Sequence, residues 1–118
     1  MVSMGTAFIA TTESRAQQAY KDMLTRSSAG DIVYTPKISG VNANFIAQSI
    51  RDNGIDLVNY AGHGPADMAA ETSDEGKAWR DIWSAGHGVG AIRDIPGVAE
   101  MVARMRQDYD PIARALAA

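Results

Sequence analysis

The residues that decide the fold are Val2-Ser3-Met4-Gly5-Thr6, which predict the end of a buried strand running into a tight turn. An apolar run over 7–10 follows and ends in Thr-Thr-Glu-Ser (11–14), a group that favours a helix start. A strand, a Gly-Thr turn and a helix can hold a phosphate, because backbone N–H groups and the threonine hydroxyl donate to anionic oxygens. The pattern alone is also that of an ordinary turn.

Length and composition predict one domain with a modest core, since the chain has 118 residues, of which 46% are hydrophobic and 21% charged. Fourteen acidic against eleven basic residues, without a basic run, argue against a nucleic-acid partner. The absence of cysteine excludes disulfides and thiolate metal sites. No apolar run reaches the roughly 20 residues that span a bilayer, so we expect no membrane association and a cytoplasmic location.

The first half of the chain predicts a helix, a strand and a second helix. A helical stripe indicates a helix from about Thr12 to Arg26, with Thr11 or Thr12 as its cap and Glu13 near its positive end. Residues 31–38 favour a strand that lies at an edge or leaves the sheet at Pro36, because proline cannot donate to a neighbouring strand. A helix carrying Phe45 and Ile46 is expected from Asn42 or Asn44 to Asn53-Gly54.

The second half predicts an irregular stretch over 54–75 and then two helices. The first begins near Ser73 and places Trp79 and Trp83 on one face, for packing or as the wall of a pocket. Residues 86–90, Gly-His-Gly-Val-Gly, are predicted to stop it, with glycines that permit positive φ. The last helix starts near Pro96 with an apolar stripe and kinks or ends at Pro111, leaving a frayed tail over 113–118.

Residues with catalytic potential are few. His63 and His87 each lie between two glycines, and the pair supplies too few ligands for a closed zinc site. We interpret both as exposed loop residues and predict no metal site. No Ser, His and carboxylate arrangement of the kind used in nucleophilic catalysis is evident, so the sequence predicts no catalytic residue.

Four stretches together resemble the C-terminal third of nitronate monooxygenases, formerly called 2-nitropropane dioxygenases. They are Val-Ser-Met-Gly-Thr-Ala-Phe-Ile-Ala-Thr-Thr-Glu-Ser (2–14), Ala-Tyr-Lys (19–21), Phe-Ile-Ala-Gln-Ser-Ile-Arg-Asp-Asn-Gly-Ile-Asp (45–56) and Lys-Ala-Trp-Arg-Asp-Ile-Trp-Ser-Ala-Gly-His-Gly-Val-Gly (77–90). The likeness extends from residue 2 to about residue 110. His87 departs from the family pattern, because many members have Gln in that position of an Ala-Gly-Gln-Gly run.

The resemblance implies an α/β fold, namely the C-terminal part of an FMN-binding (β/α)8 TIM barrel with its inserted, mainly helical substrate domain. Residues 1–11 then supply the last barrel strand and phosphate loop, 12–90 a substrate-domain segment, and 91–118 the final barrel helix and tail. The implied activity is the oxidation of alkyl nitronates with O₂. The implied FMN-binding residues are Ser3, Met4, Gly5 and Thr6, with Ser3 replacing a common Gln.

The resemblance also implies a chain that is part of a longer flavoprotein, since the family's catalytic base and other flavin-binding loops lie upstream of these motifs. We therefore expect little turnover and little retained FMN from this chain alone. We also expect self-association or association with the missing barrel portion. Two alternatives stay open, a non-catalytic helical interaction module and a small α/β phosphate-binding domain.

Overall fold

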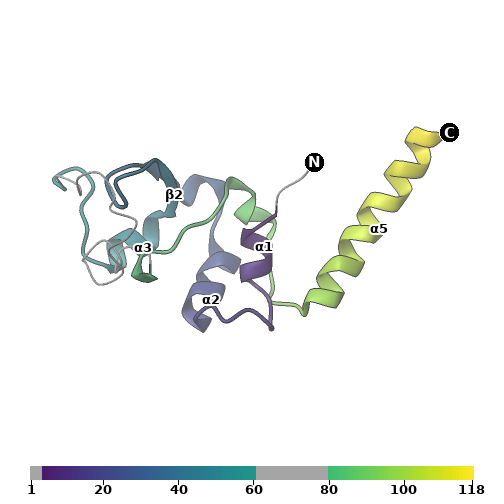
Figure 1. Ribbon diagram of the computed structural model, residues 1–118, viewed down its shortest axis with the longest axis horizontal. Coiled ribbons are helices and arrows are strands. Elements are labelled where there is room, and N and C mark those ends of the chain that lie inside the picture. Colours follow the sequence, from purple (N-terminus) through teal and green to yellow (C-terminus); the bar gives the residue numbers. More distant parts are fainter. Residues whose placement is uncertain (1–3, 61–79) are drawn as a thin grey trace.

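The computed structural model describes residues 4–60 and 80–118. Its elements form a small mixed α/β body, from which one long helix extends as an arm (Figure 1). In chain order they are α1 (Thr6–Ile9), α2 (Gln18–Arg26), the 3₁₀ turn η1 (Ala29–Asp31), β1 (Ile32–Thr35), β2 (Ala43–Ile46), α3 (Ala47–Asp52), the 3₁₀ turn η2 (His87–Ala91) and α5 (Val98–Ala117).

Strands β1 and β2 form an antiparallel hairpin in which Ile32 faces Ile46 and Thr35 faces Ala43. The predicted edge strand over 31–38 is thus confirmed at its centre, and it ends where Pro36 cannot donate. The other side of β2 is occupied by the chain around Ser84, which bridges Phe45. This segment brings residues 82–86 alongside β2 and, beyond them, η2 toward α1.

Two hydrophobic clusters lie on opposite sides of β2, because successive strand side chains point to opposite faces. Phe45 packs with Ile38, Ile50 and Ile82. Ile46 packs in the other cluster, whose buried members are Ala10, Met23, Leu24, Ile46, Ala85 and Val89. The second cluster joins α2, β2 and η2, and it therefore holds the chain after Ser84 in place against the body.

Helix α5 contributes little to this core. Met101 is its one buried residue in the described structure, while Tyr109 is 69% and Leu116 84% exposed. The molecule measures 55 × 28 × 28 Å with a radius of gyration of 16.8 Å, where about 13.5 Å is typical of a compact domain of this length. The long axis reflects the projecting arm (Figure 1). In the described part of the chain, no helix is both long and apolar enough to cross a bilayer.

The predicted helix over Thr12–Arg26 is wrong at its start, since α2 begins at Gln18. The buried Lys21 ammonium donates to the Thr11 carbonyl at 2.6 Å and to the Ser14 carbonyl at 2.8 Å. Because these carbonyls serve Lys21, the chain over 11–17 folds back over α2 and does not extend it. Glu13 likewise lies at the start of α5, not of α2.

The helix expected from Asn42 or Asn44 is also wrong in its first turn. Phe45 and Ile46 belong to β2, and helix α3 begins only at Ala47. As a strand this stretch buries two adjacent large residues on opposite faces, whereas a helix would place them about 100° apart on one side. The end of this helix is confirmed, since Gly54 adopts a left-handed φ of 73°.

The predicted helix carrying Trp79 and Trp83 is wrong for Trp83, which lies in extended chain beside β2 after the last helical residues, Arg80 and Asp81. Its start near Ser73, and Trp79, fall outside the described residues, as does most of the irregular stretch over 54–75. The run over 86–90 forms η2 without positive φ, because its turn uses ordinary 3₁₀ geometry. The prediction of a positive-φ helix stop over 86–90 is therefore wrong.

The prediction that α5 ends at Pro111 with a frayed tail is wrong, since the helix continues past Pro111 to Ala117, while a kink there stays a prediction. Proline removes one backbone donor from a helix interior. The surrounding residues of α5 are largely exposed, so water can reach the carbonyl that this donor would have served. The helix begins at Val98, two residues after the Pro96 that marks its predicted start.

Candidate functional site

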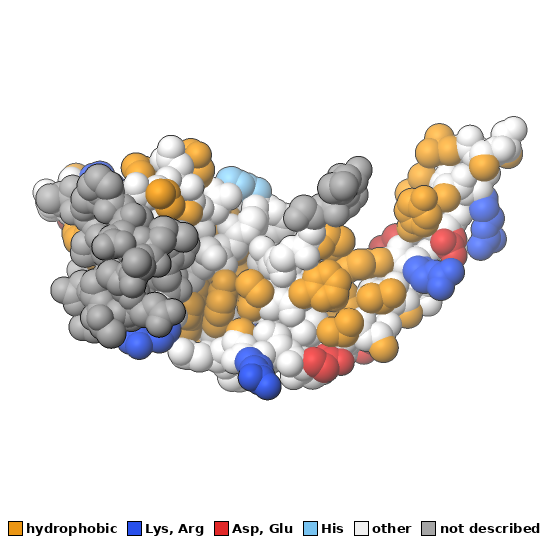
Figure 2. All heavy atoms as spheres, viewed as in Figure 1, with side chains coloured by type: hydrophobic (Ala, Val, Ile, Leu, Met, Phe, Trp, Pro, Cys, Tyr) orange, Lys and Arg blue, Asp and Glu red, His pale blue; other side chains and the backbone are white. Residues whose placement is uncertain are grey.

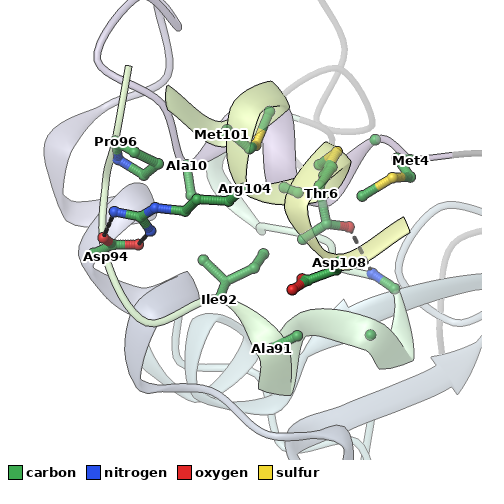
Figure 3. A pocket seen from close by; sticks show the side chains of 15 residues that line it. Met4, Thr6, Ala10, Ala91, Ile92, Asp94, Pro96, Met101, Arg104 and Asp108 are labelled. Carbon is green, nitrogen blue, oxygen red and sulfur yellow. Dashed lines mark hydrogen bonds and ion pairs between the residues drawn. The ribbon is translucent and has the colours of Figure 1, made fainter. Parts of the chain in front are cut away.

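A cavity of about 480 Å³ lies between the Met4–Thr6 turn, the segment 86–96 and the first turns of α5 (Figure 3). Its wall is mostly apolar and includes Met4, Ile92, Met101 and Met105. The charged side chains that line it are Asp94, Arg104 and Asp108. The turn singled out by sequence thus forms one edge of a hollow.

Thr6 is held in place by a residue 80 positions further along the chain. The Gly86 amide donates to Thr6 Oγ1 at 3.0 Å, a bond drawn in Figure 3. A hydroxyl has one hydrogen to donate besides its acceptor sites. Since Thr6 Oγ1 accepts from Gly86, its hydrogen remains available for an oxygen in the cavity.

Gly5 directly precedes α1, and the space beside its Cα is open. The Phe8 and Ile9 amides both donate to the Gly5 carbonyl, at 3.0 and 3.3 Å. Gly5 has φ −103°, so its backbone does not require glycine. A Cβ built there would meet no atom within 4 Å, which leaves room beside the backbone for a bound group.

Of the four predicted site residues, Met4, Gly5 and Thr6 line the cavity together, while Ser3 lies outside the described residues. Gly86 and Gly88 join them, although their sequence pattern was interpreted mainly as a helix stop. Arg104 and Asp108 were missed, because the helical stripe placed them away from the apolar face. Their positions three and seven residues after Met101 are the signal that could have placed them beside it.

The charges of the cavity are unevenly paired. Arg104 binds Asp94 at 2.8 Å and also contacts Glu100 one turn earlier in α5. The hydrogen bonds from Arg104 hold the pKa of Asp94 below its usual range. Asp108 has no ion pair among those of the described residues. The lining therefore carries two carboxylates against one guanidinium, and Asp108 is left uncompensated.

Glu13 fixes the start of α5 at the rim of the cavity. Its two carboxylate oxygens accept from the Val98 amide at 3.1 and 3.0 Å, and the Thr12 amide donates to the Pro96 carbonyl at 3.0 Å. The hydrogen bond from the Thr12 hydroxyl, followed by that from Val98, lowers the pKa of the Glu13 carboxyl. A carboxylate at this position also complements the positive end of the helix dipole.

The remaining candidates have structural roles or no assigned role. Trp83 stacks on Tyr20 with ring centroids 5.0 Å apart, which favours the packing interpretation. Burial raises the pKa of the Tyr20 hydroxyl, which donates to the Ser84 carbonyl. His87 is exposed on η2, and His63 lies outside the described residues.

The family model described as nitronate monooxygenase matches residues 1–108. The chain belongs to this family. The resemblance drawn from its motifs is thereby confirmed, and membership places it among proteins that use FMN at the family level. A search of curated proteins gives no match.

Among solved structures, this nitronate monooxygenase family chain is similar to FabK from Thermotoga maritima and to a point mutant of that protein. The mutant matches at 24% identity and a TM-score of 0.64, covering 96% of this chain and 34% of that one. FabK itself matches at 22% identity and 0.64, covering 96% of this chain and 38% of that one. The chain thus shares its fold with somewhat more than a third of the FabK chain.

Proposed function

We propose that this chain serves as the C-terminal part of an FMN-dependent oxidoreductase, and that the turn Ser3–Thr6 binds the flavin phosphate. The finer activity that we propose is the oxidation of alkyl nitronates with O₂. One observation carries the proposal, the Thr6 hydroxyl oriented by the Gly86 amide at the edge of an open cavity. Family membership supports the choice of FMN over other phosphate-containing ligands.

The fit of the residues to a phosphate is favourable in shape and mixed in charge. The space beside Gly5 admits a phosphate oxygen, and the Thr6 hydroxyl hydrogen is available to it. The first amides of α1 add donors of the kind that anions accept at turns. Asp108 lines the same cavity and opposes a second negative charge. Local geometry therefore suits the phosphate, while the one cation among the described residues that line the cavity, Arg104, is already paired with Asp94 and Glu100.

Bound FMN would supply the redox and oxygen chemistry, and the protein would bind and orient it. In this proposal residues 1–11 contribute the last barrel strand and phosphate loop, 12–90 a segment of the substrate domain, and 91–118 the final barrel helix and tail. None of the residues is assigned as the catalytic base. The chain's own contribution is the phosphate turn and the surface around it.

The test is a flavin titration of Thr6→Val in a full-length family member that carries this sequence, compared with Thr6→Ser. A hydrogen bond to a charged group contributes about 1.5–3 kcal/mol. We expect Thr6→Val to weaken FMN binding roughly 10- to 100-fold and Thr6→Ser to retain it. Thr25→Val, whose hydroxyl serves only the Asp22 carbonyl on α2, is the matched control.

A dissociation constant unchanged within twofold for Thr6→Val, with folding verified by circular dichroism, would show that Thr6 is merely a turn residue. For the chain alone we expect an FMN dissociation constant weaker than about 10 μM, because a phosphate turn by itself forgoes the contacts to the flavin ring that dominate burial. Stoichiometric yellow flavin that survives gel filtration of the chain alone would contradict this expectation.

A second candidate function is a non-catalytic helical interaction module. The observation that favours it is the exposure of apolar residues along α5. The two candidates differ in colour on purification of the full-length protein, since only the flavoprotein is yellow.

A further inference from the structure

Helix α3 ends at Asn53-Gly54, the one Asn-Gly pair of the sequence. In such a pair the glycine nitrogen can attack the asparagine side chain, because glycine has no Cβ to hinder the approach. The Gly54 nitrogen then forms a bond to Asn53 Cγ, the bond from Cγ to Nδ2 breaks, and ammonia leaves. Water opens the resulting five-membered imide to aspartate or isoaspartate, without oxidation or reduction. The pair is therefore chemically able to deamidate, and the fold decides whether it does.

The side-chain amide of Asn53 is held by two backbone carbonyls. Its Nδ2 donates to the Ser49 carbonyl at 2.8 Å and to the Asp81 carbonyl, 28 residues further along the chain, at 3.0 Å. An amide nitrogen has two hydrogens, so both are used. Because both partners are acceptors, the nitrogen and not Oδ1 must face them. These bonds hold the side chain against the end of α3 and the chain at residue 81.

The backbone at the pair also opposes the reaction. The imide requires Cβ of Asn53 and the Gly54 nitrogen on the same side of the Asn53 Cα–C bond. The ψ of Asn53 is 9°, which places the Gly54 nitrogen close to eclipsing the nitrogen of Asn53 itself, and so away from Cβ. The Gly54 amide also donates to the Arg51 carbonyl at 2.9 Å. Ring closure therefore requires this turn to open and the side chain to leave its two carbonyls.

A contact outside α3 keeps the Asp81 carbonyl in place. Ser49 is 2% exposed, and its Oγ accepts from the Trp83 amide at 2.8 Å. On its other side Trp83 is bonded to β2, since the Ile46 amide donates to the Trp83 carbonyl at 2.9 Å. In Figure 1 the chain that begins at residue 80 passes beside α3. Protection of Asn53 thus depends partly on tertiary structure and not on α3 alone.

We propose that Asn53 is a deamidation site that the fold holds closed and that opens when the chain over 81–83 separates from α3. The product would keep the two apart. An ionised carboxylate has no hydrogen to donate, so at neutral pH it cannot restore either bond, and it faces two carbonyl oxygens. The modification is therefore a one-way record of local opening. It does not rest on the phosphate assignment.

The experiment measures loss of ammonia at Asn53 by mass spectrometry after incubation at neutral pH. It compares the whole 118-residue chain with a peptide of residues 48–58, which has the same local sequence but lacks the Asp81 carbonyl. We expect the chain to react at least about tenfold more slowly than the peptide, because its bonds must open before each reaction. Equal rates in the chain and the peptide would overturn the proposal.

Ser49→Ala tests the tertiary contact, because it removes the acceptor of the Trp83 amide and leaves the Ser49 carbonyl in place. We expect it to raise the rate in the chain at least about threefold, since local opening becomes more frequent. Ser27→Ala is the matched control. It removes another buried serine hydroxyl at the end of a helix, one that donates to the Met23 carbonyl at 2.8 Å.

The control should leave the rate unchanged within about twofold, with circular dichroism verifying that both variants remain folded. Equal acceleration by the two variants would overturn the proposal, because overall unfolding and not the contact with residues 81–83 would then control the reaction.

Asn53→Asp reproduces the aspartate product and tests its effect on the fold. We expect it to lower the urea midpoint of unfolding, whereas Asn42→Asp, which adds the same charge at an exposed residue between β1 and β2, should not. Equal midpoints for the two variants would show that the product does not keep the chain over 81–83 from α3, and the one-way character would be wrong. None of these measurements involves flavin, so their failure is distinguishable from failure of the phosphate site.

Discussion

The body and the arm of this molecule differ in how far they bury large apolar side chains. Leu24, Phe45 and Ile46 are fully buried in the body, whereas Tyr109 and Leu116 on α5 are more than two-thirds exposed. The buried residues meet because distant segments are joined across β2. The α5 residues share one face of a helix whose backbone bonds lie within the helix and whose first turn is bonded to the body through Glu13. Figure 2 shows hydrophobic side chains along α5 on the side that faces the body. Burial, and not helix formation, is therefore what α5 lacks without a partner.

The sharpest test of this contrast replaces one large apolar residue in each region. Phe45→Ala should destabilise the chain by about 3–5 kcal/mol, because it removes a fully buried ring and opens a cavity in the cluster around it. Ile112→Ala should change the free energy of unfolding of the chain alone by less than about 0.5 kcal/mol. Urea denaturation followed by circular dichroism measures both.

Equal losses from the two substitutions would break the comparison, because they would show that α5 is already packed in solution. A second comparison tests whether the large loss is particular to Phe45. Val89→Ala, in the other body cluster, should also lower the free energy of unfolding by more than Ile112→Ala does.

The next largest effect is expected at Lys21, which holds the turn between the two regions. Lys21→Met keeps much of the side chain's volume but removes the donor shared by the Thr11 and Ser14 carbonyls. Two acceptors that lose a charged donor predict a loss of about 1–3 kcal/mol, again measured by urea denaturation. Lys37→Met removes a single bond to the Leu57 carbonyl and should cost less. The reverse order would mean that the Lys21 bonds do not hold the turn.

The features that could be predicted from the sequence are those that depend on neighbouring residues. The family motifs, the β1 segment, the Gly54 helix end and the amphipathic α5 follow from residue types a few positions apart. The structure places Met4, Gly5 and Thr6 of the predicted turn together at one cavity, and the binding of phosphate there stays a prediction.

The sequence did not predict what depends on distant partners. Phe45 and Ile46 read as helical until β1 and the chain at Ser84 make them a strand. Glu13 read as the start of the nearest helix, but it binds Val98, which follows 85 residues later. The Gly86 amide reaches Thr6 over a similar separation. No local pattern carries such information, because each bond depends on how the whole body folds.

The smallest expected effect concerns the Glu13 carboxylate that joins body and arm. Hydrogen bonds from Thr12 and Val98 lower its pKa from 4.5, so the bonded form is favoured when the group is ionised. Its contribution is therefore fully present above about pH 4.5 and is lost as the pH falls through the lowered pKa. Because Glu13 is exposed, we expect only a modest loosening of the first turn of α5 at low pH.

The NMR shift of the Val98 amide measures this loosening, and the midpoint of its titration with acid should lie below pH 4.5. Glu13→Gln should abolish this titration. Asp94→Asn, which weakens a different carboxylate contact of α5, the ion pair with Arg104, should leave this titration in place. A Val98 midpoint at or above the ordinary glutamate value would show that Glu13 does not hold the arm, and the contrast would then rest on packing alone.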